Sequence, residues 1–220
     1  LVVLAGTPKV GKSWFCLWLA ICVSTGRAFL DHATERAGVL YLCLEDTFGR
    51  IQNRLFHLVD VANDDLKFAI VADKLNNGLT VQLERFVSAQ PTTRLVIIDT
   101  LQKVRVATGD SVYASDYQDI GLLKAFADKN GLCILLVHHT RKMGDEANIF
   151  NTISGSNGIL GAADDIRPMG MNRVQMGNQQ HGDSAFCIKK SAFTDGFIVV
   201  RAQLLHKMLF QLALGHLQDA

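Results

Sequence analysis

A segment near the start of the chain carries residue types at a spacing that suits phosphate binding. The chain reads Gly6-Thr-Pro-Lys-Val-Gly11-Lys12-Ser13 here, which fits the pattern G-x-x-x-x-G-K-[ST]. The two glycines let the backbone curl so that its N–H groups point at phosphate oxygens. We expect Lys12 to reach the β- and γ-phosphates of ATP and the Ser13 hydroxyl to ligate Mg²⁺. The residues predicted to contact the nucleotide are Gly6, Thr7, Pro8, Lys9, Val10, Gly11, Lys12, Ser13 and Trp14.

The neighbours of this loop distinguish a phosphate site from an ordinary glycine-rich turn with an exposed lysine. Leu1–Ala5 is a continuous apolar run, which is typical of a strand buried on both faces. Lys12–Thr25 is predicted to be a helix that Gly26 closes. A helix N-terminus attracts anions through its dipole. This strand, loop and helix context favours the phosphate-binding loop.

A second motif, Leu95-Val-Ile-Ile-Asp99-Thr100, is an apolar strand that ends in a carboxylate. Many strands end in an Asp that only caps the next turn. Next to a phosphate-binding loop, however, such an Asp holds the Mg²⁺ shell beside Ser13, and we expect Asp99 to do so through water. Many ATPases with this loop place a Glu directly after the Asp. Thr100 stands there instead, so the general base is expected on another strand.

The candidate base is Glu45, in the segment Leu42-Cys-Leu-Glu45-Asp46. The strand that ends here is expected to lie beside the strand that leads into the phosphate-binding loop, which would direct Glu45 toward the γ-phosphate. Alternatively, Glu45 or Asp46 caps the helix that starts near Phe48. We favour Glu45 as the base, with Asp46 or Thr47 left as the cap.

A third strand end carries His138 and His139, followed by Thr-Arg-Lys142. An imidazole at this position can hydrogen-bond a phosphate or the attacking water and transmit its presence to the following loop. Adjacent residues of a strand point to opposite faces, so only one of the two can face the nucleotide. Either could instead be a satisfied side chain at the edge of the core. A zinc site is disfavoured because a third ligand at usable spacing is missing.

These residues need a parallel sheet to bring the strand ends together. Strands that are apolar throughout alternate with helical patterns, which indicates an α/β fold with a parallel sheet covered on both faces. Ligands of such sheets bind beyond the carboxyl ends of the strands. The further expected strands are 38–44, 66–71, 95–98 and 132–137, and the further expected helices are 48–61, 79–89 and 116–129. After about residue 140 the pattern loosens, with breaks at Pro168 and Gly170, a hairpin over 186–200 and a helix over 203–217.

Composition excludes several classes of protein. The 220 residues suit one domain, and a hydrophobic content of 49% with a net charge of +1 excludes a disordered chain. The longest apolar helical stretch, Trp14–Val23, is too short to span a membrane. Five scattered cysteines without a C-x-x-C pair favour a reduced, cytoplasmic location. The near-neutral charge argues against constitutive polyanion binding. The abrupt start at Leu1-Val-Val-Leu4 suggests a fragment without a visible targeting peptide.

Taken in order, the four motifs resemble the RecA-like ATPase core, and more narrowly the RepA-type hexameric replicative helicase branch with related phage and mobile-element AAA ATPases. The resemblance covers about residues 1–165. It implies a three-layer α/β/α core in a single RecA-like ATPase domain over 1–220, with a less regular hairpin and helix over 166–220. It also implies that Glu45 is the catalytic base and His139 or His138 the γ-phosphate sensor.

The same resemblance implies a homo-oligomeric ring, a hexamer, whose nucleotide lies between subunits and receives a basic residue from the neighbour. Arg167 is the first candidate for that arginine finger, and Lys189-Lys190 resembles the lysine-bearing tip often found in this family. Pro168 and Gly170 are expected to interrupt the strand that the family has at this point. The 140–155 loop, with Arg141 and Lys142, is expected to line the ring channel and contact single-stranded DNA.

The predicted function is Mg²⁺-dependent ATP hydrolysis by a RecA-like motor coupled to DNA transactions, of the replicative helicase kind or of the recombination and repair kind. An alternative is a nucleotide-switch ATPase that acts on a protein partner without unwinding DNA. A small-molecule phosphotransferase is less well supported, because an Arg-rich lid for an acceptor is not apparent in the sequence.

Overall fold

The computed structural model describes residues 1–60, 63–106, 112–140 and 162–169. The expected hairpin over 186–200, the closing helix over 203–217 and the 140–155 loop beyond Thr140 lie outside these residues.

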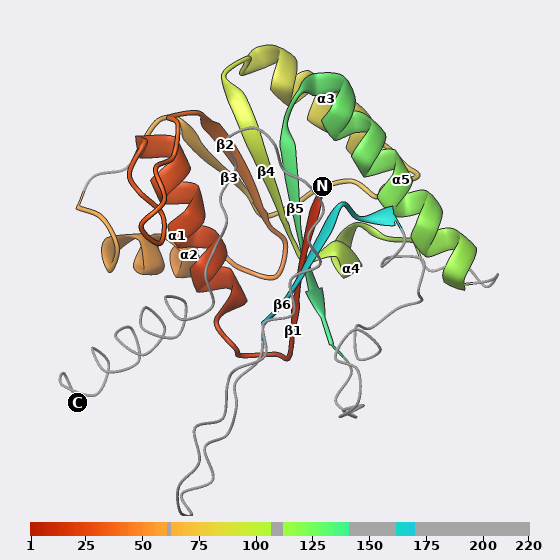
Figure 1. The fold of residues 1–220 in the computed structure, drawn as a ribbon, viewed down its shortest axis with the longest axis horizontal. Coiled ribbons are helices and arrows are strands. Elements are labelled where there is room, and N and C mark those ends of the chain that lie inside the picture. The colour runs from red at the N-terminus through yellow and green to blue at the C-terminus, as the bar shows by residue number, and fades with distance from the viewer. Residues whose placement is uncertain (61–62, 107–111, 141–161, 170–220) are drawn as a thin grey trace, which may run out of the picture.

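The described strands form one parallel sheet in the order β3-β2-β4-β5-β1-β6 (Figure 1). Every pairing in it is parallel, from β2 with β3 at one side to β1 with β6 at the other. The sequence predicts β1 to β5 because each of them contains a run of apolar residues. Their bounds are β1 Val2–Gly6, β2 Gly38–Cys43, β3 Leu66–Ala69, β4 Thr93–Asp99, β5 Cys133–His139 and β6 Asp165–Met169.

The described helices are α1 Lys12–Thr25, α2 Phe48–Phe56, α3 Leu79–Ala89, α4 Leu101–Val104 and α5 Val112–Asn130. The predicted bounds of α1 and α3 are confirmed. The prediction that α2 continues to Val61 is wrong, because the helix ends at Phe56 and the N–H groups of Leu58 and Val59 both donate to the Leu55 carbonyl in a tight turn. Leu58 and Val59 still pack on the core from that turn, which explains their apolar spacing.

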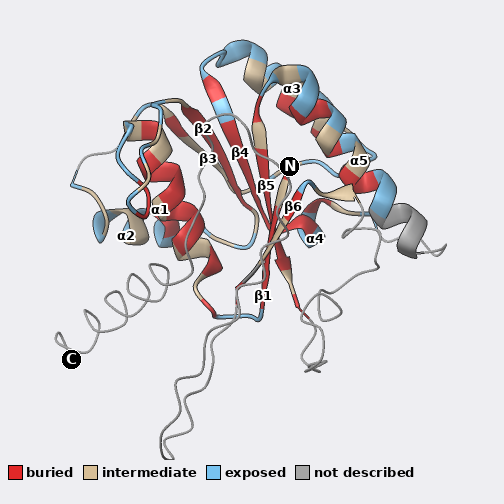
Figure 2. Ribbon diagram, in the orientation of Figure 1, coloured by how far each residue is buried: buried red, intermediate tan, exposed pale blue. Residues whose placement is uncertain are grey.

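Helices cover the two faces of the sheet (Figures 1 and 2), and an apolar layer lies under the helices of each face. Alternate residues of the strands, such as Leu4, Ile97 and Val137, pack with α1 and with Ile51 of α2. The intervening residues, such as Ile98 and Leu136, pack with α3, α4 and α5. The α/β/α three-layer class is therefore confirmed. None of the described helices is both long and apolar enough to cross a membrane.

The structure corrects the expectation that Pro168 interrupts this segment, while Gly170 lies outside the described residues. Residues 165–169 form a parallel strand beside β1, with Pro168 in register with Ala5. Within the described sheet β6 is the last strand, so its outer side has no neighbouring strand to pair with. A proline is tolerated in an edge strand because the N–H that it lacks is not needed for a second ladder.

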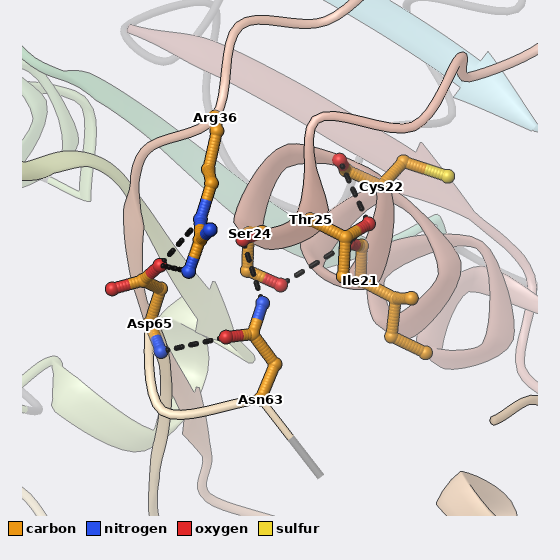
Figure 3. A network of polar contacts seen from close by, with 7 residues as sticks. All are labelled: Ile21, Cys22, Ser24, Thr25, Arg36, Asn63 and Asp65. Carbon is orange, nitrogen blue, oxygen red and sulfur yellow. Dashed lines mark hydrogen bonds and ion pairs between the residues drawn. The ribbon is translucent and has the colours of Figure 1, made fainter. Parts of the chain in front are cut away.

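The C-terminal end of α1 is fixed by a polar network (Figure 3). Gly26 ends the helix in the left-handed conformation, with φ 69°. The Asn63 side chain donates to the Ser24 carbonyl at 2.6 Å, and the Arg36 guanidinium pairs with Asp65 at 2.7 Å. The segment before β3 and the segment before β2 are thereby joined to α1. This network holds the helix at one end while its other end carries the phosphate-binding motif.

Candidate nucleotide-binding site

The predicted phosphate-binding loop connects β1 to α1, in the position that the sequence requires. Gly11, at the N-cap of α1, has φ 94°, and Lys9 has φ 65°, so the loop turns through left-handed conformations. Val10 is buried in the core and anchors the loop, whereas Thr7, Pro8 and Lys9 are exposed. Since α1 begins at Lys12, the positive end of its dipole faces the loop. The loop can therefore receive an anion from the solvent side.

Gly6 is required at the end of β1 by its contact with β6. A Cβ at this position would lie 2.3 Å from the backbone carbonyl oxygen of Met169, a distance at which the two segments would have to move apart. The Gly6 carbonyl oxygen also accepts the N–H of Thr140 at 3.2 Å. The first residue of the loop is thus packed against β6 and bonded to the residue that follows β5.

Lys12 lies inside the loop rather than extending into solvent. Its residue is 5% exposed, and its Nζ donates to the carbonyl oxygens of Gly6 and Thr7, each at 2.8 Å. Burial lowers the pKa of Lys12, while the nearby Asp99 carboxylate acts in the opposite direction. An ammonium held by two carbonyl oxygens can exchange them for phosphate oxygens, which are stronger acceptors.

Asp99 is the last residue of β4 and is 6% exposed. Its Oδ2 accepts the Tyr41 hydroxyl at 2.9 Å, and the Ser13 side chain lies near its carboxyl group. Burial raises the pKa of Asp99, and the hydrogen bonds from Ser13 and Tyr41 lower it. A carboxylate and a hydroxyl in contact are the hard oxygen donors that Mg²⁺ prefers, so the donor set fits this ion.

Glu45 contacts the ends of two other strands. Its Oε1 accepts the Thr100 hydroxyl at 3.1 Å, and its Oε2 lies 3.9 Å from Nε2 of His139. The prediction that its strand lies beside the phosphate-loop strand is wrong, because β4 and β5 separate β2 from β1. Glu45 meets His139 nonetheless because it follows the end of β2 and extends past Thr100. The exposed fraction of its side chain is 44%, so the carboxylate is open to water.

The two residues after Glu45 build the start of α2. Thr47 is the N-cap, and its side chain accepts the N–H of Arg50 at 3.4 Å. The Asp46 carboxylate pairs with the guanidinium groups of Arg50 and Arg54. These contacts answer the capping alternative: Thr47 caps the helix and Asp46 is neutralised by arginines of α2. Glu45 is left facing the site.

The two histidines of β5 point to opposite faces, as strand geometry requires. His139 lies on the face of α1, close to Glu45, and its Nδ1 is buried without a hydrogen-bond partner among the described residues. His138 is buried and shares its face with Leu136, in the layer that contains α3 and α5. Between the two, the structure therefore brings His139 to the site and places His138 in the opposite layer.

The structure also shows the contacts of two other predicted residues, Trp14 and Arg167. Trp14 packs edge-on against His57, with the ring centroids 6.5 Å apart, and the Arg54 guanidinium lies 5.7 Å from its ring centroid. Arg167 lies in β6, and its guanidinium pairs with Asp165 two residues earlier, at 2.5 Å. The further basic candidates Arg141, Lys142 and Lys189-Lys190 lie outside the described residues.

Sequence reasoning does not assign a role to Tyr41 or Thr100, both of which contact the predicted site carboxylates. The sequence does contain a signal for Tyr41. Its hydroxyl is a polar group in an otherwise apolar run, and Tyr41 stands four residues before Glu45, an even spacing that puts both on the same face of a strand. The sequence marks Thr100 only as the residue that stands where many related ATPases have a glutamate.

Comparison with known proteins agrees with this fold. A family model described as an AAA domain matches residues 1–145, which is more than half of the chain. The chain belongs to this family of AAA domains. Among solved structures, this AAA domain resembles one described as an ATPase domain, with a TM-score of 0.58 and 18% sequence identity, over 76% of this chain and 68% of that chain. A search of curated proteins finds no match. The RecA-like P-loop ATPase fold that the motifs predict is thus confirmed.

Proposed function

We propose that this AAA domain hydrolyses ATP with Mg²⁺ and couples the reaction to work on DNA. The observation that carries the proposal is the meeting of three groups at the carboxyl edge of one sheet: the Lys12 ammonium in its loop, the Asp99 carboxylate beside Ser13, and the Glu45 carboxylate beside His139. Family membership supports an ATPase, and the likeness to a solved ATPase domain supports the same fold.

Binding of the nucleotide is assigned to the loop that runs from Gly6 to Ser13, with Trp14 beside it. Its backbone N–H groups and the N-terminus of α1 attract the phosphates, and Lys12 exchanges the carbonyl oxygens of Gly6 and Thr7 for phosphate oxygens. Ser13 and Asp99 would hold Mg²⁺, with Asp99 acting through water. When bound, Mg²⁺ neutralises charge that develops on the β- and γ-phosphate oxygens.

Glu45 is assigned as the general base. A water molecule attacks the γ-phosphorus in line with the leaving oxygen, and the Glu45 carboxylate orients this water and accepts its proton. Thr100 holds one carboxylate oxygen at 3.1 Å, which leaves the other directed toward His139. The buried Nδ1 of His139, which lacks a hydrogen-bond partner among the described residues, supports the role of this ring in sensing a γ-phosphate or the attacking water.

Coupling to single-stranded DNA is assigned to the 140–155 loop, which begins where β5 ends. Thr140 donates its N–H to the Gly6 carbonyl, and that same oxygen accepts the Lys12 ammonium. A change in the bonding of Lys12 therefore reaches the first residue of this loop through a single carbonyl group. We propose that the domain works in a homo-oligomeric ring. If Arg167 acts on a neighbouring nucleotide, it must first leave Asp165.

The test is the rate of ATP hydrolysis with and without single-stranded DNA, measured together with native mass in the presence of nucleotide. The expected result is Mg²⁺-dependent hydrolysis that DNA stimulates severalfold, in an oligomer, and that Lys12→Ala abolishes. Absence of hydrolysis from a folded wild-type protein would contradict the ATPase assignment. A rate that is indifferent to DNA would contradict the DNA coupling and favour the nucleotide-switch alternative.

A further inference from the structure

Tyr41 places a hydroxyl group inside the apolar layer under α1. It lies on β2, is 2% exposed, and packs its ring 5.9 Å from the ring of Phe68. A phenylalanine would fill the same space without burying a polar atom, and a buried hydroxyl is unfavourable unless it is hydrogen-bonded. The hydroxyl therefore needs a partner, and the structure supplies one from the predicted magnesium site.

That partner is the Asp99 carboxylate, and strand register explains the contact. Along the pair of β2 and β4, Tyr41 is opposite Ile97 and Cys43 is opposite Asp99. Residues two apart on a strand share a face, so Tyr41 and Asp99 lie diagonally on the same side of the sheet. The length of the tyrosine side chain carries its hydroxyl to within 2.9 Å of Oδ2 of Asp99.

The same hydroxyl lies 3.4 Å from the Ser13 carbonyl oxygen, in the first turn of α1. A phenol has one proton to donate. The shorter distance and the charge of the carboxylate direct that proton to Asp99. The Tyr41 hydroxyl thus stands where β2, β4 and the start of α1 meet. Since one oxygen of Asp99 is bonded to Tyr41, rotation of its carboxylate beside Ser13 is restrained.

From this arrangement we infer that Tyr41 is a positioning residue of the magnesium site, which orients the Asp99 carboxylate toward Ser13 for the ion. The inference rests on the proposed function. It assigns Tyr41 no contact with the nucleotide and no part in proton transfer. Its effect is confined to metal-dependent binding: the Lys12 loop holds phosphates without Tyr41, and Asp99 and Ser13 need Tyr41 to hold Mg²⁺ well.

The test compares wild type with Tyr41→Phe in binding a non-hydrolysable ATP analogue, once in EDTA and once in Mg²⁺. In EDTA the two affinities are expected to agree within about twofold, because the loop contacts remain. Mg²⁺ is expected to increase the affinity of the variant for the analogue by a factor about tenfold smaller than the factor for wild type. This is the usual effect of removing a hydrogen bond to a charged group. Mn²⁺ binding to the complex, counted by electron paramagnetic resonance, should weaken by the same factor.

Tyr117→Phe is the matched control, because Tyr117 lies exposed on α5. It should leave both affinities unchanged. In a hydrolysis assay, saturating Mg²⁺ should restore the kcat of Tyr41→Phe to nearly that of wild type. If Tyr41 has a purely structural role, Tyr41→Phe lowers the affinities in EDTA and in Mg²⁺ together, and saturating Mg²⁺ does not restore kcat. That result overturns the inference, and so does a Mg²⁺ requirement equal to that of wild type. If wild type itself binds the analogue without any gain from Mg²⁺, the proposed function fails first, and this inference fails with it.

Discussion

Replacing Thr100 by valine tests how Glu45 is held. The Thr100 side chain is buried, and its hydroxyl donates to Oε1 of Glu45 at 3.1 Å. Valine has nearly the same shape, so the change removes one hydrogen bond and little packing. A hydrogen bond to a charged group contributes about 1.5–3 kcal/mol, and the open position of Glu45 favours the lower end. If that orientation matters for turnover, about 1.5 kcal/mol corresponds to a roughly tenfold lower kcat.

The assay is steady-state ATP hydrolysis at saturating ATP and Mg²⁺, for Thr100→Val and for the control Thr100→Ser. The serine variant retains the hydroxyl and loses a buried methyl group, so it should melt earlier while keeping kcat within about twofold of wild type. The valine variant should keep its melting temperature and lose turnover. If one variant loses only kcat and the other loses only melting temperature, the effect of orienting Glu45 is separated from the effect of packing.

A second comparison uses the Glu45→Gln background. Two residues that act through one contact give non-additive effects, so Thr100→Val should lower the residual rate of Glu45→Gln by less than about twofold. A full kcat in Thr100→Val, or an equal loss in both backgrounds, would refute the argument that Thr100 acts by holding Glu45.

Two further predictions concern Asp99 and Gly6. Burial raises the pKa of Asp99, so the native state binds its proton more tightly than the unfolded chain, and stability is lost as pH rises through the native pKa. Asp99→Asn should therefore raise the melting temperature of the metal-free protein at about pH 7, with the gain vanishing below about pH 4, and an equal melting temperature at neutral pH would contradict this. Gly6→Ala places a Cβ 2.3 Å from the Met169 carbonyl oxygen, which should destabilise the domain by about 1–3 kcal/mol in urea unfolding. An unchanged urea midpoint would show that β6 moves aside freely.

Much of the fold can be predicted because its signals are local. The apolar runs of β1, β2, β4 and β5 and the glycine that closes α1 report directly on burial and on backbone conformation. The end of α2 is not predicted because Leu58 and Val59 keep helical spacing while they pack from a turn. The strand β6 is not predicted because Pro168 disfavours a central strand, and sequence alone does not reveal that β6 is the last strand of the described sheet.

The order of the strands is the least accessible feature. Each strand has its own apolar pattern, but its neighbours depend on how the helices cross over, which is a property of the whole chain. The sequence therefore predicts that the strand before Glu45 lies beside β1, whereas β4 and β5 separate the two. The contact of Glu45 with His139 nevertheless brings Glu45 to the predicted site. Tyr41 shows the same limit, since its role depends on the register between β2 and β4.

The most direct test of the account is the Glu45→Gln variant, with ATP affinity and single-turnover hydrolysis measured on the same preparation. Glutamine keeps the shape of the side chain and its bond to Thr100 but accepts a proton poorly. If Glu45 is the base, the variant binds ATP within a few-fold of wild type and hydrolyses it more slowly by about 10²–10⁴-fold. Hydrolysis at nearly the wild-type rate, with ATP bound normally, would contradict the assignment of Glu45 as the base.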